Sequence, residues 1–505
     1  MAVKRYYAKI DNTITNAFEE NLTTRGTGSN MGASDILEVF SIYAQANSNS
    51  AEESRALLKF NATASTDSIT ADRTAGTIPA SGSVSFYLRM FNAKHGQTLP
   101  KDFTMDVSAI SGSWEEGTGL DMEAYKDKDE SNWVNRVASS SAGTHAWSTA
   151  GGDYYADTSS SFSASFDSGV EDLEVDITTL VEQWANSAGN VLGSKPDEGV
   201  GVFLSSVYSG ESRSYYTKKF FARGTEFFFK KPCIEARWDS ATKDDRGTFF
   251  FSSSLATAAE NLNTLYFYNY FRGQLRNIPA VGTGNIYLSI YSGSADDTVP
   301  DTTRLDMVAD GTHVASSSPT VVTGGYVSAG IYSASFATTG TLTTLYDVWH
   351  NNGSVQYHTG TIKPVVLDGS ATAPDTTHAS NITNLKSVYR GDETARFRVY
   401  TRQKDWSPTI YTKATAQAEV NIVESGSYEI YRVVDDLKVI PYGTGSTLHT
   451  QMSFDADGSY FDLDMEMLEK GYMYGIKLAF YNNSVGSWVE QPETFKFRVE
   501  SRQSE

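Results

Sequence analysis

The sequence predicts an all-β protein of several domains, and three observations lead to that prediction. The chain has 505 residues, so two to four domains are expected at roughly 100–200 residues per domain. Tyr and Phe are frequent (29 and 26 residues) while Pro is sparse (12 residues), a composition that suits strands joined by turns. Runs that would form a helix longer than about twelve residues are nearly absent.

The first predicted domain spans residues 1–240 and is a jelly-roll-like β-sandwich with one short helix. Its clearest strand covers residues 54–61, where polar and apolar side chains alternate. Ala56, Leu58 and Phe60 share one face of that strand, because successive side chains point to opposite sides. Arg55, Leu57 and Lys59 share the other face.

The predicted helix lies in the stretch 171–203, between two strand-like segments. Asp176 stands where an N-cap residue would accept hydrogen bonds from the first free N–H groups of the helix. Four apolar residues then recur at i, i+3, i+4 and i+7 and form one face. They are Ile177, Leu180, Val181 and Trp184. We expect this helix to lie across the sandwich with Trp184 buried.

Two further β-domains follow a charged and polar linker at 239–245. Residues 241–375 hold six or so short strands at turn-bounded spacing, which indicates an immunoglobulin-like sandwich with Trp349 in its core. Residues 376–505 form a third, β-rich domain. Its strand-like alternations cover 395–402, 427–434, 472–481 and 494–500.

Charge and cysteine content exclude several classes of protein. With 41 basic and 61 acidic residues the net charge is −20, so we expect no broad contact with nucleic acid. The single cysteine, Cys233, rules out an intrachain disulfide, and we predict that its thiol packs as a small hydrophobic group. The first residues show no signal peptide, and no apolar run approaches the ~20 residues of a membrane span.

The seven histidines show no metal-binding spacing. None is paired at i, i+4, and no His-Glu-x-x-His motif occurs. His350 and His358 are predicted on neighbouring strands and could meet in space, although hydrogen-bonded or solvent-facing rings are the preferred interpretation. The seven are His95, His145, His313, His350, His358, His378 and His449.

Acidic pairs are candidate catalytic groups, because a glycosidase needs only two carboxylates. Glu115 and Glu116 precede a Gly-Thr-Gly turn, and a second acidic group covers 127–130. A structural turn is the preferred interpretation of the first pair. Residues 455–464 resemble a calcium loop, yet an acidic position before the glycine is missing and no Glu follows at position twelve. A β-turn at Asp457–Gly458 explains that segment better. We therefore predict no catalytic, cofactor-binding or metal-binding residues and no cofactor.

Consecutive aromatic residues are the remaining candidates for function. They occur at 266–271, 215–216 and 227–229. Consecutive positions place rings on both faces of a strand, so some rings must meet a neighbour or water. Exposed rings of this kind usually mark contact surfaces. Contact between subunits is the preferred interpretation, and sugar binding is the second.

Several motifs follow one another along residues 1–240. They are the strand 54–60, Trp114-Glu-Glu-Gly-Thr-Gly119, Asn132-Trp133, Gly152-Asp153, Val175-Asp-Ile-Thr178 with Trp184, Gly199-Val-Gly-Val202 and Lys231-Pro-Cys-Ile-Glu235. Their order resembles the DNRLRE (disaggregatase-related) β-sandwich family. The resemblance implies a jelly-roll-like module of secreted and cell-surface proteins without a catalytic site of its own. The whole chain also resembles structural proteins of large marine tailed phages.

We expect from these resemblances a non-enzymatic virion structural protein, assembled in the host cytoplasm and placed outside the particle as neck or collar, fibre or capsid decoration. Its partners would be other virion proteins and further copies of itself, without nucleic acid or membrane insertion. The alternative is a carbohydrate-binding adhesin or receptor-binding module that grips a host-surface glycan through aromatic rings. A third hypothesis, a polysaccharide depolymerase, would rest on Glu115 and Glu116.

Overall fold

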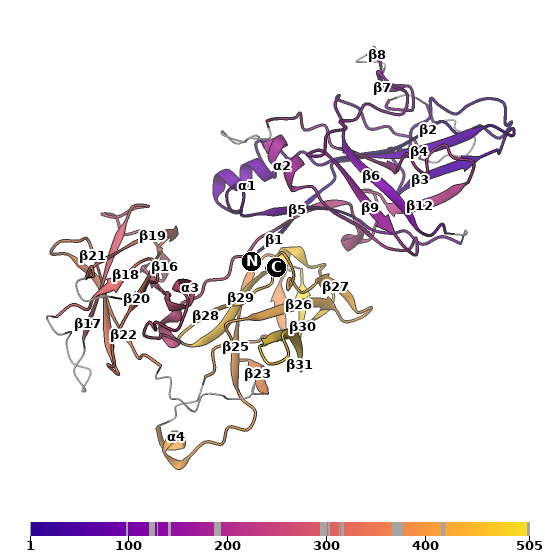
Figure 1. Cartoon of the computed structure of the whole chain (residues 1–505). Coiled ribbons are helices and arrows are strands. Elements are labelled where there is room, and N and C mark those ends of the chain that lie inside the picture. The colour runs from indigo at the N-terminus through magenta and orange to yellow at the C-terminus, as the bar shows by residue number, and fades with distance from the viewer. Residues whose placement is uncertain are drawn as a thin grey trace. The chain divides into compact units, whose positions relative to one another are not determined.

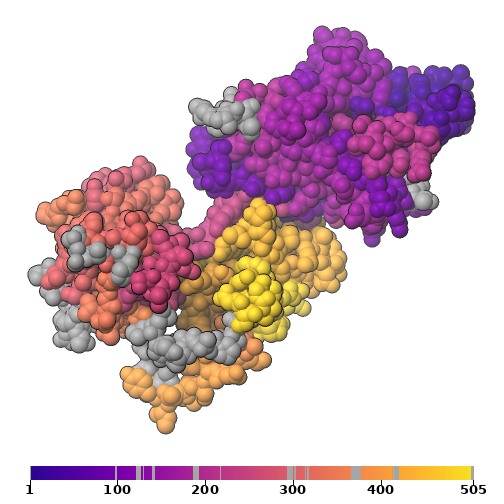
Figure 2. Space-filling model, viewed as in Figure 1, coloured from indigo at the N-terminus to yellow at the C-terminus, as the bar shows by residue number. Residues whose placement is uncertain are grey.

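The computed structural model of the chain is almost entirely β-structure arranged in several sheets (Figure 1). The predicted all-β, multidomain fold is therefore confirmed. The residues that the structure describes are 2–96, 99–120, 127–128, 130–139, 143–185, 193–292, 300, 303–312, 314, 318–365, 377–415 and 420–501, and the others are grey in Figure 2.

The chain divides into two compact units. The N-terminal unit comprises Ala2–Asp239 together with Gly445–His449, and the C-terminal unit comprises Ser240–Thr444 with Thr450–Glu505. The predicted boundary between residues 375 and 376 lies outside the described residues, so the division into three domains stays a prediction.

Two antiparallel sheets enclose the main core of the N-terminal unit. The smaller sheet has the order β1 (Val3–Tyr7), β13 (Cys233–Arg237), β5 (Ser85–Met90) and β10 (Leu173–Asp176). The larger has the order β12 (Tyr215–Phe221), β3 (Ile36–Tyr43), β4 (Ala51–Lys59), β11 (Val200–Leu204), β6 (Phe103–Ala109) and β9 (Ser161–Phe166), and β2 (Ile10–Thr15) pairs with β4. A separate ladder joins β7 (Asn135–Ser139) and β8 (Gly143–Ala146), and one 3₁₀ turn, η2, covers Phe228–Lys230.

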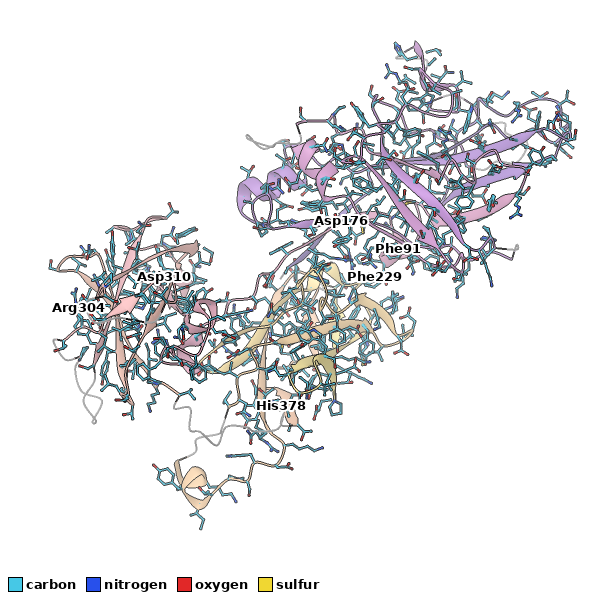
Figure 3. All side chains as sticks on the ribbon, viewed as in Figure 1. Phe91, Asp176, Phe229, Arg304, Asp310 and His378 are labelled. Atoms are coloured by element: carbon cyan, nitrogen blue, oxygen red, sulfur yellow. The ribbon has the colours of Figure 1, made fainter. Side chains whose placement is uncertain are left out.

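The predicted helix is α2 (Thr178–Ala185), and its apolar face is buried in the main core together with Ile177. Asp176 acts as the predicted cap, since its Oδ1 accepts hydrogen bonds from the backbone N–H (2.9 Å) and the hydroxyl (2.6 Å) of Thr178 (Figure 3). Glu182 on the same helix accepts two hydrogen bonds from Arg73 of α1 (Ile69–Ala75), at 2.6 and 2.9 Å. The two helices are thereby held together at one end of the sandwich.

A second, smaller core lies on the opposite side of β4, on the face that Leu57 shares with Arg55 and Lys59. Leu57 is fully buried there, because three tryptophans from distant loops cover it. The indole N–H groups of two of them are satisfied, since Trp114 donates to the Glu198 carbonyl and Trp147 to the Asn132 carbonyl, both at 2.9 Å. The apolar members of this core are Ile14, Leu57, Ile110, Trp114, Trp133 and Trp147.

The middle part of the chain, residues 240–365, forms one antiparallel ladder around a core that contains Trp349, as predicted. Strand β19 pairs with β17 through its first half and with β20 through its second, so the ladder bends around the core. The strands, in ladder order, are β14 (Asn263–Tyr268), β20 (Ile331–Thr338), β19 (Val322–Ser328), β17 (Ile286–Ser292), β21 (Leu345–His350) and β22 (Gln356–Ile362), with β18 (Met307–Val308) beside β20. This part also holds η3 (Asp245–Gly247), α3 (Ala258–Asn261) and a hairpin of β15 (Tyr270–Phe271) and β16 (Gln274–Leu275).

The last part of the chain packs two sheets against each other through aromatic rings. Phe397 and Phe461 of one sheet meet Tyr428 and Phe497 of the other, with the centroids of Tyr428 and Phe461 only 4.0 Å apart. The first sheet has the order β23 (His378–Ile382), β25 (Thr394–Gln403), β29 (Gly458–Asp464) and β28 (Ser453–Asp455). The second has the order β24 (Val388–Arg390), β31 (Ser487–Glu500), β30 (Met473–Asn482), β26 (Gly426–Arg432) and β27 (Leu437–Ile440), while α4 (Ile410–Thr415) and η4 (Met465–Met467) lie in connections.

The predicted linker at 239–245 is an ordered part of the C-terminal unit. Phe454 of β28 donates its N–H to the carbonyl of Thr242 and accepts the N–H of Asp244, both at 3.0 Å. Arg246 then holds Asp347 of β21 through two hydrogen bonds of 2.6 and 2.8 Å. The segment thus binds the middle and last parts of the chain to each other.

Candidate functional site

The histidines do not form a common site. His350 contacts the Ser289 hydroxyl through Nε2 and accepts the Asn352 N–H through Nδ1, both at 2.9 Å. The ring of His358 instead stacks on Phe267 of the core, 5.4 Å between centroids.

The hydrogen-bonded ring that the sequence favours is thus confirmed for His350, and the two rings lie on opposite faces of the sheet and do not meet. The reason is the register of β21 and β22, in which His358 lies opposite Trp349, the neighbour of His350 along the chain. His313 lies outside the described residues, whereas His95, His145, His378 and His449 each interact with neighbouring groups. Among the described residues no group of three His, Cys, Asp or Glu side chains is placed to hold a metal ion.

Glu116 of the acidic pair is part of an ion pair. Its carboxylate accepts two hydrogen bonds from the Arg223 guanidinium, at 2.6 and 2.5 Å, and one from the Asp11 N–H at 2.8 Å. The glycines that follow allow close packing, because a Cβ at Gly119 would lie only 1.9 Å from the carbonyl oxygen of Asn30. The geometry fits the structural turn that the sequence favours.

The second acidic group is only partly described. Asp127 accepts the Leu120 N–H at 3.0 Å, and Asp129 lies outside the described residues.

Asp11, beside this ion pair, offers a test of its environment by pH. Burial raises the pKa of Asp11 to about 7, although its Oδ2 accepts the Arg223 N–H at 2.6 Å. Since an unfolded Asp has a pKa near ~3.9, the native state binds a proton that the unfolded state releases between about pH 4 and 7. The stability of the wild-type protein should therefore fall as pH rises through this window.

Asp11→Asn keeps the acceptor for the Arg223 N–H and cannot ionise. The unfolding free energy of the variant minus that of the wild type should increase by about 1–3 kcal/mol from pH 4 to pH 8. Urea unfolding at both pH values measures this change. A difference between the two proteins that stays constant with pH would contradict it.

The carboxylates of the calcium-like segment have separate structural partners. Asp455 accepts hydrogen bonds from Arg398 (2.6 Å) and from the backbone of the turn, and Asp462 is held by two bonds from Arg396. The predicted hairpin between two strands is present, but its turn residues are Ala456 and Asp457, since Asp455 pairs with Gly458. The prediction of the turn is thus wrong by one residue.

Cys233 behaves as predicted, as a buried thiol. It is 1% exposed, and burial raises its pKa to about 11. A thiol that stays protonated in this way does not act as a nucleophile at neutral pH.

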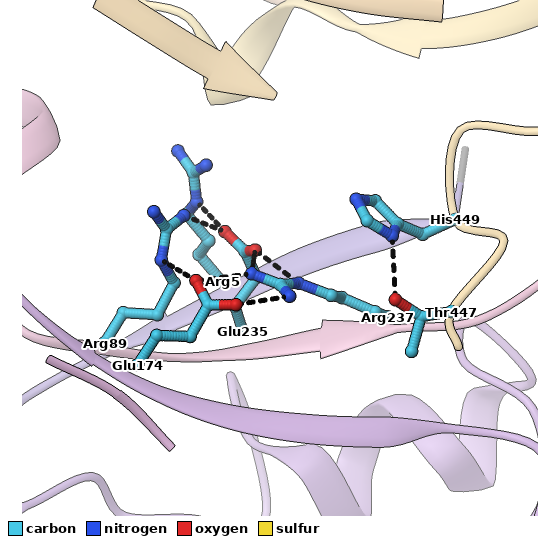
Figure 4. A network of polar contacts seen from close by, with 7 residues as sticks. All are labelled: Arg5, Arg89, Glu174, Glu235, Arg237, Thr447 and His449. Atoms are coloured by element: carbon cyan, nitrogen blue, oxygen red, sulfur yellow. Dashed lines mark hydrogen bonds and ion pairs between the residues drawn. The ribbon is translucent and has the colours of Figure 1, made fainter. Parts of the chain in front are cut away.

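The strand that begins at Cys233 also carries a buried network of charges that sequence reasoning missed (Figure 4). Glu235 accepts hydrogen bonds from Arg5 (2.7 Å), Arg89 (3.0 Å) and Arg237 (2.8 Å). Arg237 also donates to Glu174, at 2.8 and 3.0 Å. Charged residues alternating with apolar ones on β1, β5, β10 and β13 are the signal that could have indicated it. The network joins all four strands of the smaller sheet.

The aromatic segments divide into buried and exposed rings. Phe267 lies in the core, while Tyr266 and Tyr268 stack on the other face of β14 with 6.4 Å between centroids. Burial and the neighbouring Tyr460 raise the pKa of Tyr268. Tyr270 and Phe271, by contrast, are 60% and 55% exposed.

The other two aromatic segments offer less exposed surface. Phe227 is 52% exposed but packs edge-on against Phe221, and Phe229 is buried. Tyr215 packs on the main core, and the side chain of Tyr216 lies outside the described residues.

The exposed rings belong to the hairpin of β15 and β16, residues 270–275, which we call the aromatic hairpin. Its turn residues, Arg272 and Gly273, have φ values of +50° and +76°. At its base Arg276 donates its N–H to the Asn269 carbonyl (3.0 Å) and accepts a bond from the Asn269 amide (2.6 Å). The guanidinium groups of Arg272 and Arg276 lie 5.4 and 5.9 Å from the centroid of the Phe271 ring. A fixed turn thus presents aromatic rings and positive charges together.

Comparison with known proteins identifies no relative. No family model matches the chain, and no curated protein matches it. The solved structures that it matches include *Escherichia coli* α-2-macroglobulin (8% identity, TM-score 0.16, 88% of this chain and 21% of that one) and the *Yersinia pseudotuberculosis* adhesin InvE (15% identity, TM-score 0.15, 48% and 59%). The chain thus spans about a fifth of the length of the first and three fifths of the second. Such low scores carry no inference.

A membrane-spanning helix was also sought. Among the described residues, none of the helices has the length and apolar character that crossing a membrane requires.

Proposed function

We propose that this chain is a non-enzymatic structural protein that assembles with other proteins, and that the aromatic hairpin is one of its contacts. The observation that carries the proposal is the pair of exposed rings, Tyr270 and Phe271, flanked by two arginines on a fixed turn. Aromatic residues and Arg are enriched at protein interfaces and dominate their binding energy. Because the turn is already ordered, binding through it costs little conformational entropy.

The charge of the chain suggests the kind of surface that the hairpin meets. The two arginines of the hairpin favour an acidic partner surface, and the chain itself carries a net charge of −20. A second copy of the chain supplies such a surface, which supports a homo-oligomer. Other acidic proteins of the same particle would fit the hairpin equally well.

The site of assembly that we propose is the exterior of a tailed phage particle, as neck or collar, fibre or capsid decoration. The resemblance of the whole chain to phage structural proteins supports this placement. A strongly acidic chain also suits an exterior position better than a surface that surrounds packaged DNA. Mass spectrometry of purified particles should detect the chain. Its consistent absence from particles of a phage that encodes it would overturn the placement.

The hairpin contact is tested by the double variant Tyr270→Ser/Phe271→Ser. Native mass spectrometry of the full-length wild type should show a discrete oligomer, and the variant should associate at least about tenfold more weakly. Leu255→Ser is the matched control, since Leu255 is 96% exposed in the same part of the chain.

Oligomers that persist unchanged in the double variant would refute the role of the hairpin. A monomeric wild type that binds glycans through the same two rings would favour the alternative, a carbohydrate-binding module. Glycan-array binding of both proteins distinguishes these outcomes.

A further inference from the structure

A buried lysine lies where the two sheets of the N-terminal unit meet. Lys218 on β12 is 1% exposed. Its Nζ lies 2.8 Å from Oδ1 of Asn92, 3.1 Å from the carbonyl oxygen of Gly169 and 2.6 Å from that of Glu171. Asn92 directly follows Phe91, which is labelled in Figure 3 at the end of β5. The contact therefore joins a strand of the larger sheet to the residues that follow a strand of the smaller one.

The surroundings of this amine favour its neutral form. The rings of Phe166 and Phe220 lie 4.8 and 5.1 Å from Nζ, so much of its shell is apolar. Burial lowers the pKa of Lys218 to about 8, although the charges of Glu171 and Asp172 act to raise it. Roughly a tenth of the side chains are then uncharged at pH 7, a far larger fraction than for an exposed lysine.

Three acceptors surround Nζ, and together they match the three N–H groups of an ammonium. A neutral amine has two N–H groups and one lone pair. The carbonyl oxygens of Gly169 and Glu171 can receive both N–H groups. Loss of the proton then gives up the bond from Nζ to Oδ1 of Asn92 and frees a lone pair beside its carboxamide.

The backbone that carries Asn92 is held in place. The backbone N–H of Asn92 donates to Asp172 at 2.7 Å, and the next residue, Ala93, donates to the carbonyl of Lys219 at 2.9 Å. Asn92 itself pairs with Phe220, two residues beyond the lysine. Two groups fixed at contact distance react with an effective concentration far above that of separate molecules.

We propose that Lys218 and Asn92 form an intramolecular isopeptide bond. Nζ attacks Cγ of Asn92, the bond from Cγ to Nδ2 breaks, and the product is a secondary amide between the two side chains. One ammonia leaves, and the proton that the lysine ammonium loses before the attack departs with it as ammonium ion. No oxidant or other reactant is consumed.

Glu171 positions the amine through its backbone carbonyl, which lies 2.6 Å from Nζ. Its carboxylate oxygen Oε1 accepts hydrogen bonds from the backbone and hydroxyl of Ser168, both at 2.6 Å. Although burial acts to raise it, these bonds lower the pKa of Glu171 to about 2, so the carboxylate is a poor acceptor for the lysine proton. Glu171 is therefore a positioning residue, and the amine reacts through the fraction that is already neutral.

The bond would act as a covalent cross-link, as a disulfide does in other proteins. It would close a loop between residues 126 apart in sequence and tie the two sheets of the sandwich together. A cross-link over such a loop restricts the unfolded chain, and the single cysteine cannot provide one. Unlike a disulfide, an amide resists reduction.

The intact mass of the folded, full-length wild-type protein tests the proposal. It should lie about 17 Da, the mass of ammonia, below the mass calculated from the sequence. Proteolysis should yield one linked species that contains both the Asn92 and the Lys218 peptides. Lys218→Arg and Asn92→Ala should both restore the calculated mass.

Lys219→Arg is the matched control, because the neighbouring lysine should leave the loss of ammonia unchanged. The decisive measurement is on the wild type, so it does not depend on the folding of any variant. A folded wild-type protein with the full calculated mass and two unlinked peptides, after prolonged incubation at pH 7–8, would overturn the proposal. Oligomer formation by the aromatic hairpin is independent of this result.

Discussion

Replacing Trp184 by alanine is expected to lower the free energy of unfolding of the N-terminal unit by about 3–5 kcal/mol. The ring is only 4% exposed and lies in the main core with Leu180 and Val181 of the same helix. Alanine would lose the transfer free energy of the ring and leave a cavity that rigid neighbouring strands cannot fill. The helix α2 is short, so it depends on this contact more than on its intrinsic propensity.

Trp184→Phe should cost clearly less than the alanine variant. The indole Nε1 is buried with no hydrogen-bond partner among the described residues, so phenylalanine fills most of the space and removes an unsatisfied donor. Thr74→Ala on the exposed side of α1 is the control and should change stability by no more than about 0.5 kcal/mol.

Because the chain has more than one unit, its unfolding is not expected to be two-state. Hydrogen exchange of peptides from residues 2–239, followed against urea concentration, isolates the relevant transition. If Trp184→Ala does not change the urea concentration at which these peptides unfold, the ring is not buried.

The periodicity of apolar residues correctly predicted helices and strands whose buried face is set by residues of the same element. The spacing of Ile177, Leu180 and Trp184 indicates a helix, and the alternation of Ala56 and Leu58 indicates a strand, because each pattern places its own residues on one face. Both predictions are confirmed, and both faces lie in the main core.

Features that depend on pairing between distant segments could not be predicted in the same way. Leu57 shares a strand face with Arg55 and Lys59, and alternation alone does not show that tryptophans from loops far along the chain cover it. His350 and His358 were assigned to neighbouring strands correctly, but the register of those strands decides that their rings diverge. A shift of one residue reverses the face of every side chain, and sequence spacing alone does not fix the register.

The candidate sites also divide into features set by local sequence and features set by the pairing of distant segments. Motif reasoning predicted the hairpin at 453–464, which needs only local residues, whereas the partners of Glu116 are Asp11 and Arg223, far along the chain. The contact of Lys218 with Asn92 links residues 126 apart, and only the pairing of the strands brings them together.

Replacing Glu235 by glutamine is expected to cost about 3–5 kcal/mol, because it leaves buried guanidinium groups without their counter-charge. Glu235 is 1% exposed and accepts bonds from Arg5, Arg89 and Arg237. Glutamine keeps the size of the side chain and one acceptor oxygen. The loss of unfolding free energy therefore measures the contribution of the charge rather than that of packing. Glu211→Gln, on an exposed loop, is the matched control.

The effect of pH separates this loss of charge from a general loss of structure. Burial acts to raise the pKa of Glu235, but the charges of Arg5, Arg89 and Arg237 outweigh it and hold the pKa far below its usual range. The stabilisation is therefore complete above the unfolded pKa of about 4.3 and is lost as pH falls towards the native value. The wild type should lose this contribution between about pH 5 and pH 2, whereas Glu235→Gln has none to lose.

The two proteins should thus differ most near pH 7, and the difference should narrow on acidification, which urea unfolding of the N-terminal unit at several pH values measures. A double-mutant cycle with Arg5→Met should also give a coupling energy of about 1–3 kcal/mol, since the two side chains meet at 2.7 Å. A difference independent of pH, together with additive effects in the cycle, would mean that Glu235 acts by filling space. The predicted combination would instead show that the smaller sheet is held together by a network in which the buried charge of Glu235 is stabilised by its neighbours.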